Sequence, residues 1–157
     1  MTNQNSKIKQ GKIIAISISK TKGTKKNNIK SAVLKEDFGI MGDAHSGTKD
    51  RQVSLLAEES IEKMRRLSLK VSAGDFAENI TTSGIDLLKL KIGDKLKVGE
   101  DVLLEISQIG KVCHSPCNIY YQAGDCIMPK EGIFAKVLKG GIIKPGDNII
   151  QTLNPKS

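Results

Sequence analysis

The sequence predicts a single domain built mainly of β-strands, either a barrel or a sandwich, with one or two short helices. Three observations lead to this prediction. Short β-favouring runs follow one another between residues 80 and 109, divided by Gly84, Gly93 and Gly99. The dipeptide Gly-Asp occurs five times, and glycine supplies the positive φ at which strands reverse. A chain of 157 residues suits one domain with its own core.

The first strand is predicted around Ile14, Ile16 and Ile18. These isoleucines alternate with small residues, and a period of two puts all three on one face of a strand. After a loop rich in Lys and Asn, residues 31–36 form the second predicted strand. A stretch rich in glycine and polar residues, 39–47, follows it.

One helix is predicted over Leu55–Leu67. Acidic Glu58 and Glu59 lie in its first turn, and basic residues lie in its last turn, which suits the helix dipole. Ile61 shares a face with apolar neighbours at helical spacing, so the helix is expected to pack on a sheet.

The remaining strands are predicted from β-favouring runs at 80–82, 85–92, 95–98 and 102–109. Near the end, Lys144-Pro145-Gly146-Asp147 repeats the arrangement of residues 91–94 before another apolar run, 148–153. The chain is therefore expected to close with a further hairpin.

Charge is unevenly distributed, because residues 1–35 hold nine lysines and no acidic residue. Lys20, Lys22, Lys25 and Lys26 are interleaved with Gly, Thr and Asn, a pattern typical of a solvated loop. Basic segments can bind polyanions. However, three Phe, two Tyr and no Trp leave few rings for base stacking, which argues against a nucleic-acid partner.

Targeting and redox features predict a cytoplasmic protein with no membrane partner. No apolar run approaches the roughly 18 residues of a membrane span. The start of the chain lacks a secretory apolar region and a cleavage site. The three cysteines lie between positions 113 and 126, and an odd number fits reduced thiols better than a disulfide framework.

The segment most suited to chemistry runs from Lys111 to Ile119, is followed by Cys126, and directly follows a predicted strand. Pro116 ends regular strand pairing and so predicts a loop at a sheet end, where a thiol is both held and accessible. The thiolate is the reactive form of cysteine, and nearby positive charge favours it. The pattern predicts a nucleophile or sulfur carrier. The candidate catalytic residues are Cys117, Cys113, Cys126 and His114.

Two other interpretations of these cysteines stand beside the first. Free cysteines are most often small buried hydrophobic residues. The three cysteines and His114 are also four soft ligands that suit zinc. Structural zinc sites usually pair two knuckles, however, and Cys126 has no second ligand close to it in the sequence.

Further polar residues suggest a pocket. His45, in Gly42-Asp43-Ala44-His45, and Arg51 predict an imidazole and a guanidinium at a pocket edge. Asn79 follows Phe76-Ala77-Glu78 and is as well suited to capping a turn as to binding a ligand.

Ordered motifs along the chain resemble those of the MOSC family, the domain named after the C-terminal part of molybdenum cofactor sulfurase. The resemblance extends from about residue 11 to residue 150. The matching motifs are Gly39–His45, Arg51–Leu56, Phe76–Ile80, Ile92–Asp94, Cys113–Cys117, Gly124–Pro129, Glu131–Val137 and Gly146–Asp147.

The resemblance implies a β-barrel-like domain over residues 11–153, with tails at 1–10 and 154–157, of the small stand-alone bacterial type. It implies a role in molybdenum cofactor metabolism, in which a cysteine carries sulfur as a persulfide or contacts molybdenum. By its position in the motif, Cys117 is the first choice for both roles. The cofactor's phosphate suits cationic side chains. The candidate cofactor-binding residues are Arg51, His45, Lys111 and Asn79.

The resemblance also implies partners. Family members that sulfurate the cofactor themselves carry a pyridoxal-phosphate-dependent desulfurase domain. This chain is too short for one, so we do not expect it to bind pyridoxal phosphate alone. A separate cysteine desulfurase is the expected sulfur donor, and a molybdoenzyme or a cofactor biosynthesis protein is the expected recipient. Whether the chain is itself a sulfurtransferase stays open, and the alternative is a non-catalytic module that binds molybdenum cofactor or an oxyanion.

Overall fold

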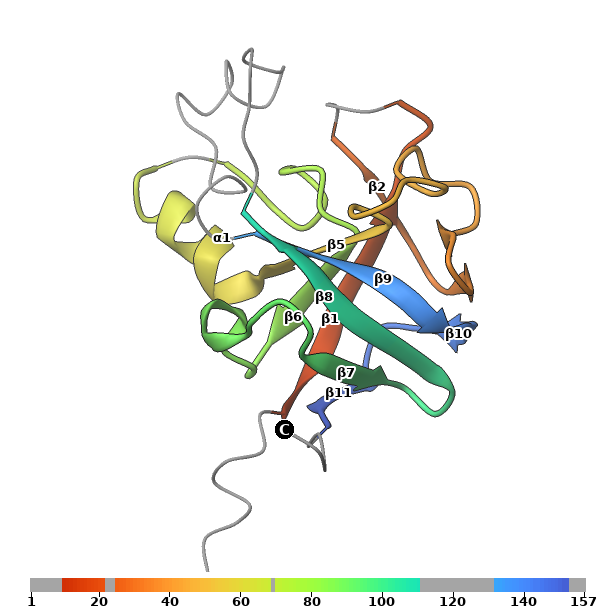
Figure 1. Cartoon of the computed structure of the whole chain (residues 1–157). Helices are drawn as coiled ribbons and strands as arrows, with labels where there is room; N and C mark the ends of the chain where they lie inside the picture. Colours follow the sequence, from red (N-terminus) through yellow and green to blue (C-terminus); the bar gives the residue numbers. More distant parts are fainter. Residues whose placement is uncertain (1–9, 22–24, 69, 111–131, 153–157) are drawn as a thin grey trace, which may run out of the picture.

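A computed structural model describes residues 10–21, 25–68, 70–110 and 132–152 (Figure 1). Within these ranges, seven strands form a closed barrel. The barrel strands are β1 (Gln10–Ile18), β5 (Val53–Ala57), β6 (Ile80–Ser83), β7 (Lys95–Val98), β8 (Val102–Ile109), β9 (Ile133–Lys139) and β11 (Asn148–Gln151). The predicted class, a mainly β domain of barrel type with few helices, is confirmed.

The strands follow the order β11-β7-β8-β9-β5-β6-β1 around the barrel, and β1 closes it by pairing antiparallel with β11. In the described part, the only parallel neighbours are β5 and β6. Parallel neighbours need a crossover connection, and α1 (Glu58–Arg65) lies in it. The remaining strands are β2 (Asn27–Ile29), which pairs with β1, and β3 (Ala32–Lys35), β4 (Gly39–Ile40) and β10 (Gly141–Ile143), which form a small second sheet.

Apolar side chains fill two regions. The barrel interior is packed by residues such as Ile16, Leu55 and Leu104, each 0% exposed. A second cluster joins Ile61 and Met64 of α1 to Leu56, Phe76, Ala77 and Phe134. The helix therefore covers one side of the barrel, which it reaches through β5 and β9.

The predicted helix over Leu55–Leu67 begins later than expected, at Glu58. Its end charges agree with the prediction, because acidic residues lie in the first turn and basic residues in the last. Leu55 belongs instead to β5, a strand with neighbours on both sides and almost no exposed side chain. Periodicity alone cannot separate a short, mostly apolar and fully buried strand such as this one from part of a helix. Among the described residues, no helix is long and apolar enough to cross a membrane.

The first strand contains a β-bulge, which shifts the register between Ile13 and Ala15. Ile13 and Ile16 are buried at 1% and 0% exposure, whereas Ile14 is 45% exposed. The prediction that Ile14, Ile16 and Ile18 share one face is therefore wrong for Ile14. A bulge adds one residue to a strand and so breaks its simple alternation.

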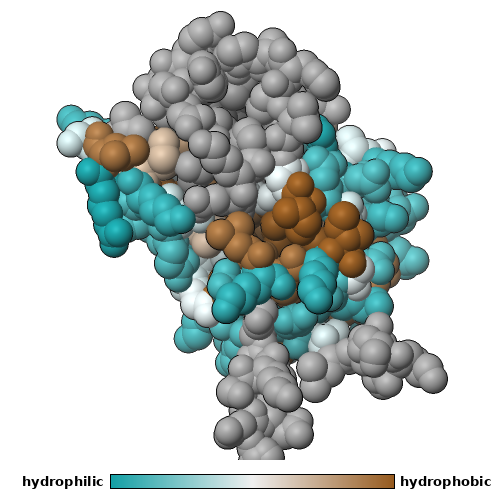
Figure 2. Space-filling view, turned by 60° about the vertical axis from the view of Figure 1, so that its left-hand side comes forward, coloured by the Kyte–Doolittle hydropathy of each residue, from teal (hydrophilic) through white to brown (hydrophobic). Residues whose placement is uncertain are grey.

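The predicted β-run at 85–92 is also wrong. This segment contains a short 3-10 helix, η2 (Leu87–Lys89), begun by Asp86, whose carboxylate accepts the N–H of Leu88. Leu87 is buried while Leu88 is 54% exposed, so the apolar residues of this segment do not all face the core. Figure 2 shows apolar surface on the side of the molecule that carries α1.

The two repeated Gly-Asp turns have the same hydrogen bonds. Lys91 N donates to the Asp94 carboxylate at 2.8 Å, and Lys144 N donates to the Asp147 carboxylate at 3.0 Å. The predicted repeat is confirmed, but the predicted closing hairpin is wrong. β11 pairs with β1 and β7, while β10 pairs with β3. Closing the barrel through β11 leaves neither β1 nor β7 as an open edge.

Candidate functional site

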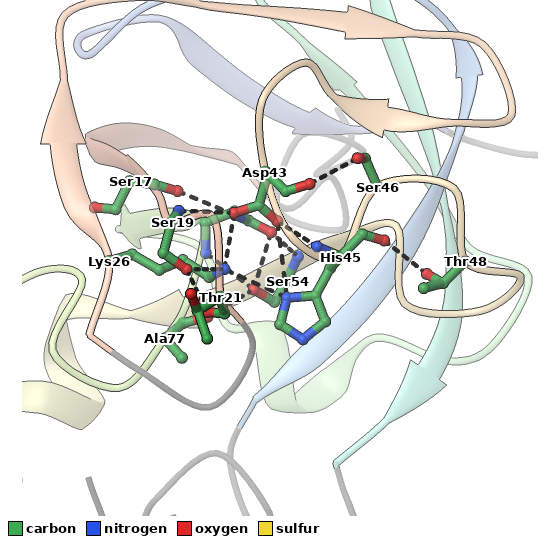
Figure 3. A network of polar contacts seen from close by, with 11 residues as sticks. Ser17, Ser19, Thr21, Lys26, Asp43, His45, Ser46, Thr48, Ser54 and Ala77 are labelled. Atoms are coloured by element: carbon green, nitrogen blue, oxygen red, sulfur yellow. Dashed lines mark hydrogen bonds and ion pairs between the residues drawn. The ribbon is translucent and has the colours of Figure 1, made fainter. Parts of the chain in front are cut away.

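Polar side chains gather around Lys26, where the ends of β1 and β4 and the start of β2 meet (Figure 3). Lys26 Nζ lies 2.8 Å from Asp43 Oδ1 and 3.3 Å from His45 Nδ1. The side chains of Lys26 and Asp43 are 0% exposed, whereas that of His45 is 10% exposed. The cluster therefore combines a buried ion pair with an imidazole that reaches the surface.

The Asp43 carboxyl is held in its ionised form. Burial alone raises its pKa, but the hydrogen bonds of His45 and Lys26 and the charge of Lys26 outweigh burial, so the pKa of Asp43 lies well below its ordinary value. The backbone N–H of His45 donates to Oδ2 at 3.0 Å, and that of Ser19 donates to Oδ1 at 3.1 Å. These contacts give the buried ammonium a fixed counter-charge.

Lys26 is a residue that the sequence pattern missed. The prediction of a solvated Lys/Asn loop is wrong at this position, because Lys26 is 4% exposed. Its N–H donates to Gly74 O at 2.8 Å, and a Cβ added at Gly74 would lie 2.5 Å from Lys26 O. Lys26 differs from the exposed lysines near it in sequence because the turn around Gly74, far along the chain, packs against its backbone. The Gly-Asp dipeptide at 74–75 was the one local signal for that turn.

Glu78 anchors the turn that contacts Lys26. Its carboxylate accepts the N–H groups of Gly74 and Phe76 and the hydroxyl of Thr81. Burial raises the pKa of Glu78, and these hydrogen bonds oppose the shift. Glu78 therefore acts on the cluster indirectly, through the backbone of residue 74.

Asn79 connects two barrel strands. Its Oδ1 accepts the N–H of Ser54 in β5 at 2.9 Å, and its Nδ2 donates to Ser17 O in β1 at 3.0 Å. The residue is 0% exposed. In the described structure the Asn79 amide therefore links β1 to β5 by hydrogen bonds.

Arg51 lies beside the ends of β8 and β9, between which residues 111–131 run. Its guanidinium carbon is 5.6 Å from the centroid of the Phe134 ring, and its Nε donates to Gln108 Oε1 at 3.1 Å. Gly110 N donates to Gly132 O at 2.8 Å, which joins the two strand ends. A cation–π contact and one hydrogen bond thus orient the guanidinium beside the end of β8 and the start of β9.

Residues 111–131 lie outside the described part of the chain. They include the predicted site residues Lys111, Cys113, His114, Cys117 and Cys126. Of the other predicted residues, His45 contacts Lys26 while Arg51 contacts Gln108 and Phe134. These partners differ, so the contacts within the described part of the chain do not join His45 to Arg51.

A cavity of about 560 Å³ borders the Lys26 cluster. Ile18 and Ile29 supply apolar surface, Lys20 and Lys25 supply positive charge, and Gly42 directly precedes Asp43. This combination suits a planar ring that carries an anionic group. A second cavity of about 250 Å³ lies between α1 and residues 84–88. In the described ranges, no three His, Cys, Asp or Glu side chains are grouped to hold a metal ion.

These features define a small closed-barrel domain with a buried Lys-Asp-His cluster and a cysteine-bearing connection between β8 and β9. The chain belongs to the MOSC domain family, whose model matches residues 42–150. This family is associated with proteins of the molybdenum cofactor sulfurase type. No curated protein matches the sequence.

Solved structures share the fold. The crystal structure of YuaD from Bacillus subtilis has a TM-score of 0.79 at 20% identity, covering 94% of this chain and 99% of that one. YiiM from Geobacillus stearothermophilus has a TM-score of 0.71 at 21% identity, covering 91% of this chain and 75% of that one. YiiM from Escherichia coli has a TM-score of 0.67 at 18% identity, with 92% and 70% covered.

Proposed function

We propose that the protein acts in molybdenum cofactor metabolism, as a cytoplasmic cysteine-based sulfur carrier that binds the cofactor. Membership of the MOSC family is the observation that carries this proposal. The cysteines of the family-like motif lie in the segment that leaves the barrel beside Arg51. Thiols in the sequence that connects β8 to β9, together with a guanidinium oriented beside the ends of these strands, suit a ligand with both a soft metal and a phosphate.

Sulfur loading is a thiol exchange on Cys117. Its thiolate attacks the outer sulfur of a persulfide on a cysteine desulfurase, a new S–S bond forms on Cys117, and the donor cysteine leaves as a thiolate. No net electrons are exchanged in this step. Release of the carried sulfur as sulfide takes two electrons, which a second thiol supplies by attacking the inner sulfur and forming a disulfide. The recipient is the cofactor or a molybdoenzyme.

Donor side chains hold the cofactor's oxygens in this proposal. Arg51 presents a planar guanidinium, which pairs with phosphate through parallel hydrogen bonds. His45 and Lys111 supply further donors. Asn79 takes no part as a donor in this proposal, because its amide is buried and bonded to Ser54 and Ser17. The fit rests on chemistry, because the Arg51 guanidinium can only donate hydrogen bonds and the cofactor's phosphate accepts them.

Incubation with a cysteine desulfurase and cysteine is expected to add about one sulfur atom to the protein, removable by a reducing thiol. We expect Cys117→Ser to abolish this gain completely, because the variant has no thiolate at the carrier position. Cys113→Ser and Cys126→Ser serve as matched controls and should keep it. Intact mass spectrometry measures all four proteins. An undiminished gain in Cys117→Ser would move the carrier role to another cysteine, and no gain in any protein would contradict sulfur carriage.

The variant Arg51→Lys is expected to bind molybdopterin at least tenfold more weakly. Lysine keeps the charge but lacks the planar, two-pronged guanidinium that lies over the Phe134 ring. A hydrogen bond to a charged group contributes about 1.5–3 kcal/mol. Equilibrium dialysis measures the Kd. The control is Arg66→Lys at the exposed end of α1. Equal affinities of the two variants would remove Arg51 from the binding site.

The alternative function is a binding module for the cofactor or for an oxyanion, without sulfur transfer. The cavity with Lys20 and Lys25 on its lining favours it, because lysine ammonium groups attract oxyanions. This alternative predicts molybdate or pterin binding by a protein whose cysteines never gain sulfur.

A further inference from the structure

The ammonium group of Lys26 is surrounded by three acceptors. Its Nζ lies 2.8 Å from Asp43 Oδ1, 3.3 Å from Ser19 Oγ and 3.3 Å from His45 Nδ1. An ammonium has three hydrogens to donate and no lone pair to accept one. Each of the three neighbouring atoms must therefore act as an acceptor toward Lys26.

The hydrogen bonds of the other partners agree with this assignment. Ser19 donates its hydroxyl hydrogen to Thr21 O at 2.8 Å, which leaves an oxygen lone pair for Lys26. His45 Nδ1 lies 3.7 Å from Asp43 Oδ2, which is too long for a hydrogen bond. Nδ1 thus has Lys26 as its hydrogen-bond partner, and an N–H on Nδ1 would point at an ammonium.

The hydrogen of a neutral His45 ring is consequently on Nε2. Figure 3 shows this second ring nitrogen on the side of the imidazole away from Lys26. Of the three charged or titratable side chains, only that of His45 reaches the surface, at 10% exposure against 0% for the other two. The edge of the cluster that a ligand can reach therefore belongs to the imidazole.

We infer that Lys26 and Asp43 form a positioning pair that fixes His45 in the Nε2–H tautomer, so that His45 donates a hydrogen bond to an oxyanion ligand. The tautomer follows from the contacts of the free protein. The choice of ligand rests on the proposed function, in which the ligand carries phosphate and metal-bound oxygens. In this tautomer the Nε2 lone pair is not available, so His45 is a hydrogen-bond donor and not a metal ligand.

The cost of burying the pair supports a positioning role. A buried ion pair of this kind is often no more stabilising than apolar residues of similar volume, because both charges lose their hydration. Stability alone therefore does not require Lys26 and Asp43 here. Their common neighbour is His45, whose backbone N–H is held by Asp43 Oδ2 while its ring nitrogen is held by Lys26.

Long-range proton–nitrogen NMR spectra of the ligand-free protein test the tautomer. The chain has two histidines, so His114→Gln assigns the His45 signals. We expect an unprotonated Nδ1 and a protonated Nε2. In Lys26→Met, the ring is expected to shift toward the Nδ1–H form, because Nδ1 then faces no ammonium and a small rotation of the ring brings it within hydrogen-bond distance of Asp43 Oδ2, now 3.7 Å away. The control is Lys30→Met, an exposed lysine just after β2. If Lys26→Met does not fold, Lys26→Met with Asp43→Asn removes both charges and should give a mixture of tautomers.

A protonated Nδ1 in the unmodified protein would overturn the inference, as would an unchanged tautomer in the folded variant without Lys26. Molybdate and inorganic phosphate, titrated separately, test the ligand. Either should shift the His45 Nε2–H signal, and binding should weaken at least tenfold in the Lys26 variant but not in Lys30→Met. No shift with either anion would overturn the donor role toward oxyanions. Sulfur loading is measured separately by mass, so its failure leaves the tautomer result intact.

Discussion

Replacing Asp43 with Asn is expected to lower the free energy of unfolding by about 3–5 kcal/mol, since removing one partner of a buried ion pair leaves an uncompensated charge. The Lys26 side chain is 0% exposed and would have no counter-charge. Lys26 Nζ and the His45 backbone N–H both donate hydrogen bonds to the carboxylate of Asp43. The NH2 group of an asparagine side chain would face one of these two donors and could not accept its hydrogen bond. Urea unfolding followed by circular dichroism measures the loss.

The matched control is Glu58→Gln. Glu58 pairs with Arg65 at 2.6 Å, a shorter distance than in the buried pair, but the two side chains are 30% and 32% exposed. Exposed pairs contribute no more than about 1 kcal/mol, so this variant should lose little stability. A loss in Asp43→Asn no greater than that in Glu58→Gln would contradict the assigned role of burial.

The effect of Asp43→Asn should also depend on pH. The pKa of Asp43 is lower in the folded protein than in the unfolded chain. The ionised carboxylate therefore makes its full contribution to the free energy of unfolding above the unfolded carboxyl pKa of roughly 3.9, and this contribution is lost as the pH falls toward the pKa of the folded protein. The difference in unfolding free energy between the two proteins should therefore shrink as the pH is lowered below about 5. Glu78, whose pKa is raised, contributes in the opposite direction, but it is present in both proteins and cancels in the difference.

Replacing Gly74 with Ala is expected to cost about 3 kcal/mol or more, the sum of backbone strain and a lost contact. Gly74 has φ +93°, a left-handed conformation that costs other residues about 1–2 kcal/mol. In addition, the new Cβ would lie 2.5 Å from Lys26 O and 2.9 Å from Ser17 Oγ. The turn must then move away, which breaks the hydrogen bond from Lys26 N to Gly74 O.

The control variant Gly93→Ala separates the cost of backbone strain from the cost of the close contact with Lys26. Gly93 has a similar φ of +98° but nothing within 4 Å of an added Cβ. It should show the backbone cost alone, so that Gly74→Ala unfolds at a clearly lower urea concentration. Equal losses of unfolding free energy in Gly74→Ala and Gly93→Ala would mean that the close contact between the turn and Lys26 does not contribute to stability. The His45 tautomer provides a second measurement, which should change in Gly74→Ala and stay unchanged in Gly93→Ala.

Local chemistry made much of the fold predictable. The turns at Gly93 and Gly146 follow from a glycine with positive φ and an aspartate that accepts a nearby backbone N–H, all within four residues. The strands β7 and β8 follow from short β-favouring runs between such turns. The predictions that failed depended on distant partners. β5 lacks the alternation of a half-buried strand because β6 and β9 flank it and bury both of its faces, and the bulge in β1 belongs to its pairing with β6.

The candidate site divides in the same way. Sequence motifs alone proposed His45, Arg51 and the cysteine segment as candidates, because imidazole, guanidinium and thiol groups suggest chemistry wherever they occur. Only the tertiary structure distinguished Lys26 from the lysines around it. Its burial depends on the turn at Gly74, held by Glu78, and its charge depends on Asp43. A sequence determines which groups are available and where the chain can turn, but desolvation and ion pairing depend on neighbours that only folding brings together.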